Sequence, residues 1–233
     1  MSAFTLKSIA LVTMLIDHFA HIFGGRLVFA LVPPMRAVGR LAFPIFVYFI
    51  GEGFRRTGNV KKYMARLGAF ALISEIPFDL ATKNARYIPM ACPITWLEFG
   101  GQNIFFTLFL GLLAAYVYSL GGFAFVLLPL PLALAFVLNV DYGVIGVALV
   151  FACAVLEDRT TRLAVLAAGG LALYLPIGGT FAVMLIAGYT AAVLLLSRYN
   201  GVQGPRLKWL FYSFYPLHLL ALFGLLLLYE SLI

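Results

Sequence analysis

Ionisable side chains lie inside apolar stretches of this sequence, where they are costly and usually mark functional paths. Asp17, His18 and His21 belong to the first apolar stretch, which begins beside Lys7, and His218 belongs to the last. On a helix, His18 falls within about 20° of the bearing of Lys7 and roughly 16 Å further along the axis. A neutral imidazole at that depth can accept a proton from an amine or a hydroxyl. This predicts His18 as a catalytic general base.

The neighbours of His18 have separate predicted roles. Asp17 and His21 are four residues apart and share a helix face, whereas Asp17 and His18 are adjacent and do not face each other. We therefore expect Asp17 to bond His21 or a basic residue of another span, and His18 to be oriented from outside its own helix. Arg40 is either the partner of Asp17, a clamp for a developing anion, or a cation at the membrane interface.

Three polar residues in the middle of the sequence are further candidates. Asn103 offers an amide that can stabilise an oxyanion, although hydrogen bonding between helices is the more common use of such a group. Glu75 and Asp79 are four residues apart on either side of Pro77. They form either an acid/base and substrate-binding pair or a structural network with Arg40.

The last apolar stretch, 207–229, places Tyr212, Tyr215 and His218 at three-residue steps, with Pro216 between them. A helix interrupted by proline often borders a cavity. We therefore predict that Tyr215 and His218 contact substrate, and aromatic packing is the alternative interpretation of the tyrosines.

Other charged residues have simpler interpretations. Glu52 lies within reach of Arg55 and Arg56, which predicts a salt bridge at the membrane boundary. Asp141 is interpreted as a helix N-cap. The densest basic cluster follows from topology, from attraction to anionic lipid headgroups, or from binding a phosphate-bearing donor such as a coenzyme A thioester; it consists of Arg55, Arg56, Lys61, Lys62 and Arg66.

The composition fixes the fold class. The 233 residues are 64% hydrophobic and 11% charged, which leaves too little polar surface for a soluble globule. Runs of about 20 apolar residues predict an all-α, polytopic bundle of transmembrane helices in one domain over residues 1–233. The net charge of +7 lacks the basic stripe typical of nucleic-acid binding. We place nine spans, within a range of eight to ten, at 5–23, 38–54, 62–80, 102–119, 122–138, 142–156, 162–176, 180–196 and 207–229.

The charges between these spans predict the topology. Eleven Lys and Arg residues fall on one side and five on the other, which places the N-terminus in the cytoplasm. Residues 26–37, with Pro33 and Pro34, are interpreted as an interfacial or re-entrant segment. The loop over 81–101 is either a lid over an external mouth or a plain connector.

Several motifs together resemble the TraX family of bacterial integral membrane proteins. They are K-x-IA with M-x-x-DH from Lys7 to His18, GRLAFPIF from Gly39, EGFRRT from Glu52, ISEIPFD from Ile73, QNIFFTL from Gln102, DYG from Asp141 and FYSFYPLHL from Phe211. The family looks like a small member of the membrane acyltransferases. In the larger members an Arg and a catalytic His are separated by ten residues on the first span, and Lys7 and His18 have that spacing here.

The resemblance implies a bacterial inner-membrane acetyltransferase. Acetyl-CoA would be the donor, reached from the cytoplasm by Lys7 and the basic cluster, and no metal is expected. The acceptor would be an amine or hydroxyl on the outer side, by resemblance the N-terminus of pilin, or another envelope component. His18 would be the base, Asp17 and His21 its support, and Asn103 or Arg40 the oxyanion stabiliser, by direct transfer or through an acetyl-histidine.

Two other classes stay open. Ionisable residues within spans and helices interrupted by proline are also typical of transporters and proton channels, although no inverted repeat is visible. A non-catalytic pilus assembly factor is the third possibility. Binding of acetyl-CoA separates the first alternative from an acetyltransferase.

Overall fold

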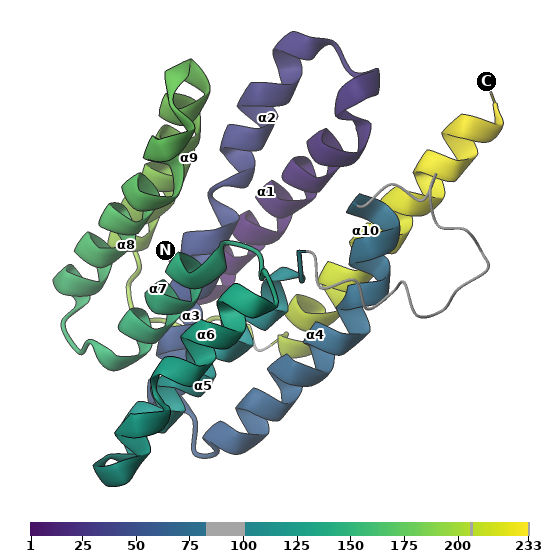
Figure 1. Ribbon diagram of the computed structural model, residues 1–233. Coiled ribbons are helices and arrows are strands. Elements are labelled where there is room, and N and C mark those ends of the chain that lie inside the picture. The colour runs from purple at the N-terminus through teal and green to yellow at the C-terminus, as the bar shows by residue number, and fades with distance from the viewer. Residues whose placement is uncertain (83–100, 206, 233) are drawn as a thin grey trace.

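The computed structural model describes residues 1–82, 101–205 and 207–232. The segment predicted as a lid or connector therefore lies mostly outside the described residues. All the named elements of the described chain are helices (Figure 1). In chain order they are α1 Ala3–Phe23, η1 Gly24–Arg26, η2 Phe29–Leu31, α2 Val32–Gly39, α3 Ala42–Arg56, α4 Val60–Thr82, α5 Ile104–Leu120, η5 Gly122–Leu127, α6 Pro129–Val137, α7 Gly143–Val155, α8 Arg159–Tyr174, η6 Leu175–Ile177, α9 Gly179–Ser197 and α10 Lys208–Ser231.

The all-α bundle predicted from composition is confirmed, and each predicted span corresponds to a helix or a pair of helices. Local side chains fix several of the helix starts. Ser2 caps α1 by accepting a hydrogen bond of 3.2 Å from the Thr5 backbone N–H. Asp158 caps α8 in the same way, at 2.6 Å from the Thr161 N–H. Such caps satisfy donors that a helix leaves unpaired at its first turn.

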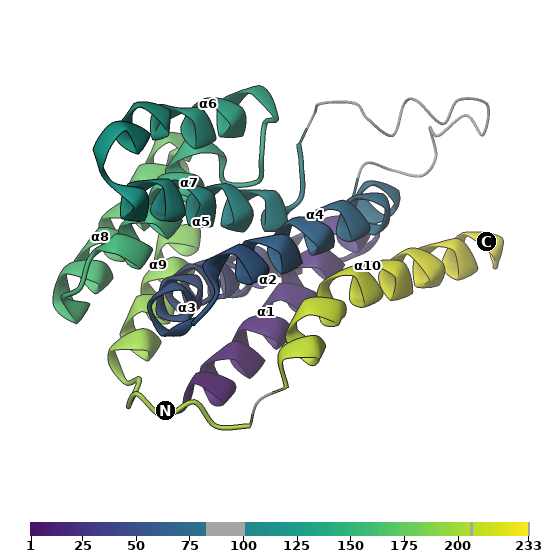
Figure 2. The same ribbon diagram turned by 90° about the horizontal axis from the view of Figure 1, so that it is seen from below.

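The helices form three groups, the first of which contains α1 (Figures 1 and 2). The bent pair α2 and α3 packs along α1, and α10 packs on its other side against α4. Helices α5, α6 and α7 form a second group, joined to the first where α5 contacts α4 and α7 contacts α3. Helices α8 and α9 pair with each other, and α9 packs against α2. Helix α1 therefore lies between α2 and α10, and its side chains can meet either.

The N-terminus is tied to the loop that follows α9. The Met1 ammonium donates a hydrogen bond of 2.7 Å to the Arg198 carbonyl, and the Ala3 N–H donates one of 2.8 Å to the Val202 carbonyl. Figure 2 shows this loop running past the N-terminus toward α10. These bonds join the start of α1 to the segment that leads into α10.

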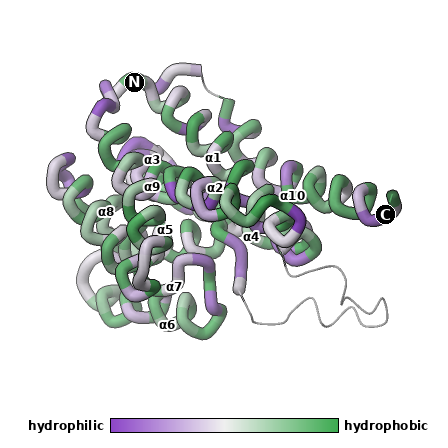
Figure 3. The backbone as a smooth tube through the Cα atoms, turned by 90° about the horizontal axis from the view of Figure 1, so that it is seen from above, coloured by the Kyte–Doolittle hydropathy of each residue, from purple (hydrophilic) through white to green (hydrophobic). Residues whose placement is uncertain are grey.

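Large apolar side chains lie both inside and outside the bundle. Tyr48, Tyr189 and Phe43 are almost completely buried in its core. Phe123 is nevertheless 87% exposed and Leu217 61% exposed, and the outer helices are apolar over most of their length (Figure 3). A surface that exposes so many large apolar groups fits a lipid environment.

Five stretches of the described chain are long and apolar enough to cross a membrane: Ala3–Arg26, Phe29–Arg56, Arg159–Ile177, Gly179–Ser197 and Lys208–Ser231. Three shorter apolar stretches, Ile104–Leu120, Gly122–Val137 and Gly143–Val155, accompany them. Helix α4 is not among these stretches; it carries Lys61, Lys62, Arg66, Glu75 and Asp79. The chain is built as a multi-pass membrane protein.

The interfacial segment predicted before the second span is wrong over its second half. Residues 32–39 form α2, which continues into α3 after a bend, so that Phe29–Arg56 is one long apolar stretch. Pro33 and Pro34 occupy the first turn of α2. Proline is favoured at that position because its missing N–H has no partner there in any case. The two prolines therefore start a helix rather than prevent one.

The span predicted over 122–138 is not a single regular helix. It consists of the 3₁₀ segment η5 followed by α6, with Pro129 and Pro131 in the first turn of α6. The α-helical part has only 9 residues. Proline at these positions removes backbone donors and fixes the helix start, which explains the change of helix type.

Gly188 tests the packing of α9 on α2. A methyl group placed at Gly188 would lie 1.9 Å from the Ala37 carbonyl oxygen, whereas Gly224 in α10 has nothing within 4 Å of that position. We expect Gly188→Ala to destabilise the protein by about 1–3 kcal/mol because two helix backbones must separate. Gly224→Ala should be neutral or slightly stabilising. Thermal unfolding in detergent measures both, and equal midpoints for the two variants would contradict this packing.

Candidate functional site

The side chain of Asp17 joins α1 to α2. Its Oδ2 lies 2.9 Å from Nη1 of Arg36 and 2.5 Å from Nη2 of Arg40. Arg40 also donates from Nε to the Arg36 carbonyl at 3.2 Å. The prediction that Asp17 pairs with a basic residue of another span is confirmed. A carboxylate shared by two guanidiniums has a net charge of +1 for the three groups.

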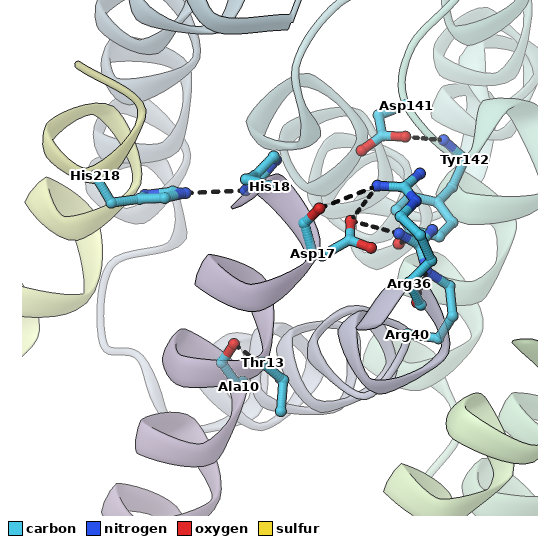
Figure 4. A network of polar contacts seen from close by, with 9 residues as sticks. All are labelled: Ala10, Thr13, Asp17, His18, Arg36, Arg40, Asp141, Tyr142 and His218. Carbon is cyan, nitrogen blue, oxygen red and sulfur yellow. Dashed lines mark hydrogen bonds and ion pairs between the residues drawn. The ribbon is translucent and has the colours of Figure 1, made fainter. Parts of the chain in front are cut away.

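Gly39 allows this close approach. A methyl group at Gly39 would lie 2.2 Å from the Asp17 Cβ, so any larger residue would push α2 away from α1. The absence of a side chain at Gly39 lets α2 present Arg36 and Arg40 on both sides of the Asp17 carboxylate. Figure 4 shows the three side chains meeting on the α2 side of α1.

His18 points to the opposite side, toward α10 (Figure 4). Successive residues of a helix are about 100° apart, so fixing Asp17 against α2 turns His18 away from α2. Its Nδ1 lies 2.9 Å from Nε2 of His218. The orientation of His18 from outside its own helix, expected from the sequence, is confirmed.

The hydrogen bonds assign a tautomer to each imidazole. Nδ1 of His218 lies 2.8 Å from the Phe214 carbonyl oxygen. A carbonyl only accepts, so neutral His218 carries its proton on Nδ1 and leaves Nε2 as an acceptor. His18 must then donate its Nδ1–H to that acceptor. The lone pair of neutral His18 is consequently on Nε2, the nitrogen free to accept a proton.

His18 lines a cavity of about 330 Å³, called here the polar cavity. Phe78, Thr82, Gly101 and Tyr142 form part of its wall. Its ionisable residues come from α1, α2 and the turn before α7: Asp17, His18, His21, Arg36, Arg40 and Asp141. A polar cavity lined by a neutral imidazole suits a polar reactant that must lose a proton.

A second cavity of about 260 Å³, called here the apolar cavity, opens nearer the start of α1. Its walls are aromatic and aliphatic, and include Phe46, Ile50, Leu67 and Phe105. It adjoins a third cavity of about 510 Å³, the basic vestibule, with which it shares five residues. The cations on these two cavities are Lys7, Arg56, Arg66 and Lys208.

Lys7 lies where the apolar cavity and the basic vestibule meet. Its ammonium is 4.9 Å from the ring centre of Phe49 and 5.6 Å from that of Phe211. Among the described residues no carboxylate or hydrogen-bond acceptor pairs with it. A cation held between two aromatic faces and facing two cavities is available to an anionic ligand.

Tyr215 and Met14 separate the apolar cavity from His18. Both line the apolar cavity, and Met14 precedes His18 by one helical turn. The ring of Tyr215 contacts that of His18 edge-on, with ring centres 5.7 Å apart. Tyr215 also contacts His218, at 5.6 Å. The histidine pair therefore lies between the two cavities, within one ring of the apolar cavity.

Asn103 lies away from this centre. It is completely buried and caps α5, with its Oδ1 accepting from the Phe105 N–H at 3.0 Å. Its amide nitrogen donates to the Ala71 carbonyl at 2.8 Å and to Glu75 at 2.5 Å. The structure gives Asn103 and Glu75 an interhelical role between α5 and α4. Neither they nor Asp79 line the three cavities.

The predicted basic cluster divides into two parts. Arg55 bonds Glu52 at 2.9 Å and the Cys153 carbonyl at 2.7 Å, and so connects α3 to the end of α7. Lys61 and Lys62 are exposed at the start of α4 and line none of the three cavities. Only Arg56 and Arg66 of the cluster reach them.

The predicted salt bridge of Glu52 is confirmed and is larger than expected. Its carboxylate bonds Arg55 and Arg56, each at 2.9 Å, and also Arg162 of α8 at 2.7 Å. Arg162 is buried and lies 4.8 Å from the ring centre of Tyr48. This group of charges holds α8 to α3, and two of its members, Glu52 and Arg56, also line the basic vestibule.

Asp141 is not the N-cap of α7. Tyr142 occupies that position in a left-handed conformation, with φ of 61°, and Asp141 Oδ1 accepts from the Tyr142 N–H at 3.1 Å. The Tyr142 hydroxyl is 3.3 Å from Nη1 of Arg40, and its ring stacks on Phe43. Sequence reasoning assigned neither residue to the site. The signal available in the sequence is the run Asp-Tyr-Gly, whose Asp and Gly favour a turn.

The ion pairs of Asp17 predict an order of stabilities. Asp17→Asn leaves two guanidiniums without a counter-charge, and we expect a loss of about 3–5 kcal/mol. Arg40, whose side chain is 12% exposed, should be costlier to replace by Gln than Arg36, which is 26% exposed. Unfolding midpoints in detergent rank the three variants, and an Asp17→Asn variant as stable as the parent chain would contradict the arrangement.

Comparison with known proteins identifies the family. The family described as TraX protein matches residues 2–226 of the chain. The probable fimbrial assembly protein FimC, serogroup H1, of Dichelobacter nodosus is 33% identical over 239 residues, which cover 95% of this chain and 94% of that protein. No solved structure matches the chain. The resemblance seen in the motifs is thus confirmed, and the chain belongs to the TraX family.

Proposed function

We propose that this protein is a membrane-embedded acetyltransferase that acts in pilus assembly. It would move an acetyl group from acetyl-CoA, bound in the basic vestibule and the apolar cavity, to an amine or hydroxyl presented in the polar cavity. The observation that carries the proposal is the position of His18: its ring lines the polar cavity and contacts Tyr215 of the apolar cavity.

The apolar cavity and the basic vestibule together suit acetyl-CoA as the donor. Acetyl-CoA supplies an activated thioester carbonyl and carries several phosphates. Lys7, Arg66 and Lys208 would neutralise the phosphates, whereas Arg56 already bonds Glu52 in the vestibule wall. The aromatic walls around Phe105 would hold the uncharged arm of the donor. Lys7 has no anionic partner in the described chain, so it can bind a phosphate without breaking an existing bond. The fit of these residues to the donor supports the assignment.

His18 would act as the base on the acceptor. Its Nε2 accepts the proton that the acceptor loses as the acceptor nitrogen or oxygen bonds to the acetyl carbon. His18 then returns that proton to the thiolate released when the carbon–sulfur bond breaks, so that no proton is left over. His218 keeps the Nδ1–H of His18 occupied and thereby directs the Nε2 lone pair to the acceptor.

Arg40 is the cation of the polar cavity best placed to stabilise a developing oxyanion, although it already bonds Asp17 and Tyr142. His21 would support the acceptor from the same cavity. The role in pilus assembly rests on the printed name of the D. nodosus relative, and pilin is the proposed acceptor on that ground. The N-terminal end of the bundle, which carries the basic vestibule, would face the cytoplasm, where acetyl-CoA is made.

Binding of acetyl-CoA to the purified protein tests the donor site. We expect Lys7→Met to weaken binding about tenfold, the equivalent of roughly 1.4 kcal/mol, because it removes a cation that pairs with no carboxylate of the described residues. Arg198→Met is the control, since Arg198 is exposed at the same end of the bundle and lines none of the three cavities. Calorimetry in detergent measures both variants. Absence of acetyl-CoA binding by the parent chain would overturn the proposal and would favour a transporter or a non-catalytic assembly factor.

Transfer assays test the base. His18→Ala should lower the rate of acetyl transfer by about 10²- to 10⁴-fold while acetyl-CoA binding is retained, and added imidazole should restore part of the rate. Mass spectrometry of membrane and surface components, with and without the protein, supplies the acceptor by its gain of one acetyl group. If His18→Ala transferred acetyl normally while His21→Ala or His218→Ala did not, the assignment of the base would be wrong.

A further inference from the structure

The polar cavity holds two carboxylates in different electrostatic states. Asp17 is neutralised by Arg36 and Arg40. Asp141 lines the same cavity, is exposed to it, and has no ion pair in the described part of the chain. One of its oxygens accepts the Tyr142 N–H, and no side chain of the described residues bonds the other. An ionised carboxylate has acceptor positions for about four hydrogen bonds, so Asp141 can still bind a donor.

The backbone around Asp141 is held rigidly. The Asp141 N–H donates to the Gln102 carbonyl at 2.9 Å, and the Asp141 carbonyl accepts from the hydroxyl of Thr107. Asn139 and Tyr142 both have positive φ angles, of 47° and 61°. Non-glycine residues adopt this conformation at a cost, and they keep it where surrounding contacts enforce it. Asp141 is therefore presented to the cavity from a fixed turn.

We propose that Asp141 is the residue that selects a protonated amine as the acceptor. The carboxylate would bind the ammonium group by charge-assisted hydrogen bonds and hold it in the cavity that His18 lines. A hydroxyl of the same size would gain much less from that carboxylate, because it carries no charge. This inference rests on the proposed acetyltransferase function and assigns the recognition of its amine acceptor to Asp141.

The protons balance in two steps. The bound ammonium first releases one proton to solvent and becomes a neutral amine. His18 then accepts the second proton as the amine nitrogen bonds to the acetyl carbon, and returns it to the coenzyme A thiolate as the carbon–sulfur bond breaks. The products are an amide and free coenzyme A, and no other reactant is needed. Asp141 binds and orients the amine; the bond-making step does not pass through it.

Two short peptides that differ in one group test the inference. One begins with alanine and has a free amine, and the other begins with lactic acid and has a hydroxyl in its place. Calorimetry without acetyl-CoA should show that the parent chain binds the alanyl peptide about 10- to 100-fold more tightly than the lactyl peptide. Asp141→Asn should remove this difference, and Glu157→Gln, which removes an exposed carboxylate outside the cavity, should keep it.

Transfer assays with the same peptides separate this inference from the function. With Asp141→Asn we expect kcat/KM for the alanyl peptide to fall about 10- to 100-fold, with acetyl-CoA affinity unchanged. Equal binding of the two peptides by the parent chain, or a discrimination that survives Asp141→Asn, would overturn the role of Asp141. Discrimination in binding without any acetyl transfer would support the ammonium site and overturn the acetyltransferase proposal instead.

Discussion

The carboxylate of Asp17, shared by Arg36 and Arg40, fixes how α1 is rotated in the bundle. A charge inside an apolar bundle needs its partners, because an unpaired ion there costs several kcal/mol. Helix α1 therefore turns its Asp17 face toward α2, and Gly39 lets the two backbones come close enough for both guanidiniums to reach. The adjacent residue, His18, is thereby directed to α10. One ion-pair group thus determines what His18 can contact.

The histidine pair follows from that rotation. His218 is held by the carbonyl of Phe214 and in turn holds His18, so the direction of both hydrogen bonds is set by a group that can only accept. The ring of Tyr215 then separates His18 from the apolar cavity, while His18 itself lines the polar cavity. On one side of this proton acceptor, Lys7 has no carboxylate partner among the described residues. On the other side, Arg36 and Arg40 share the Asp17 carboxylate. The arrangement is suited to transfer between two different reactants.

The sequence predicts much of this because the signals are local. Runs of apolar residues locate the helices, and the depth of His18 and its spacing from Lys7 single out both residues. The predictions fail where tertiary contacts decide. Asn103 looks like an oxyanion donor in the sequence, but in the fold its amide groups are used by α5 and α4. Asp141 looks like a helix N-cap in the sequence. In the fold Tyr142 occupies the N-cap position in a left-handed conformation, and Asp141 lines the polar cavity instead.

The roles of the basic residues also depend on contacts between distant parts of the chain. Charge density along the chain favours Lys61 and Lys62, which the fold leaves exposed and outside the cavities, and it overlooks Lys208. Lys208 lies about 200 positions from Lys7 in sequence, and the two line the same cavities because the segment before α10 passes the start of α1. Nothing in a single sequence records that proximity, since no local pattern connects two positions so far apart.

The protonation state of the His18 ring tests the central claim most directly. The chain has only 3 histidines, so ¹⁵N-labelled histidine in bilayer samples gives few signals, which single His21 and His218 variants assign. We predict that neutral His18 carries its proton on Nδ1, in a hydrogen bond to His218, and that its Nε2 is unprotonated. A neutral His18 with the proton on Nε2 would contradict the account, because the nitrogen that faces the acceptor would then be unable to act as a base.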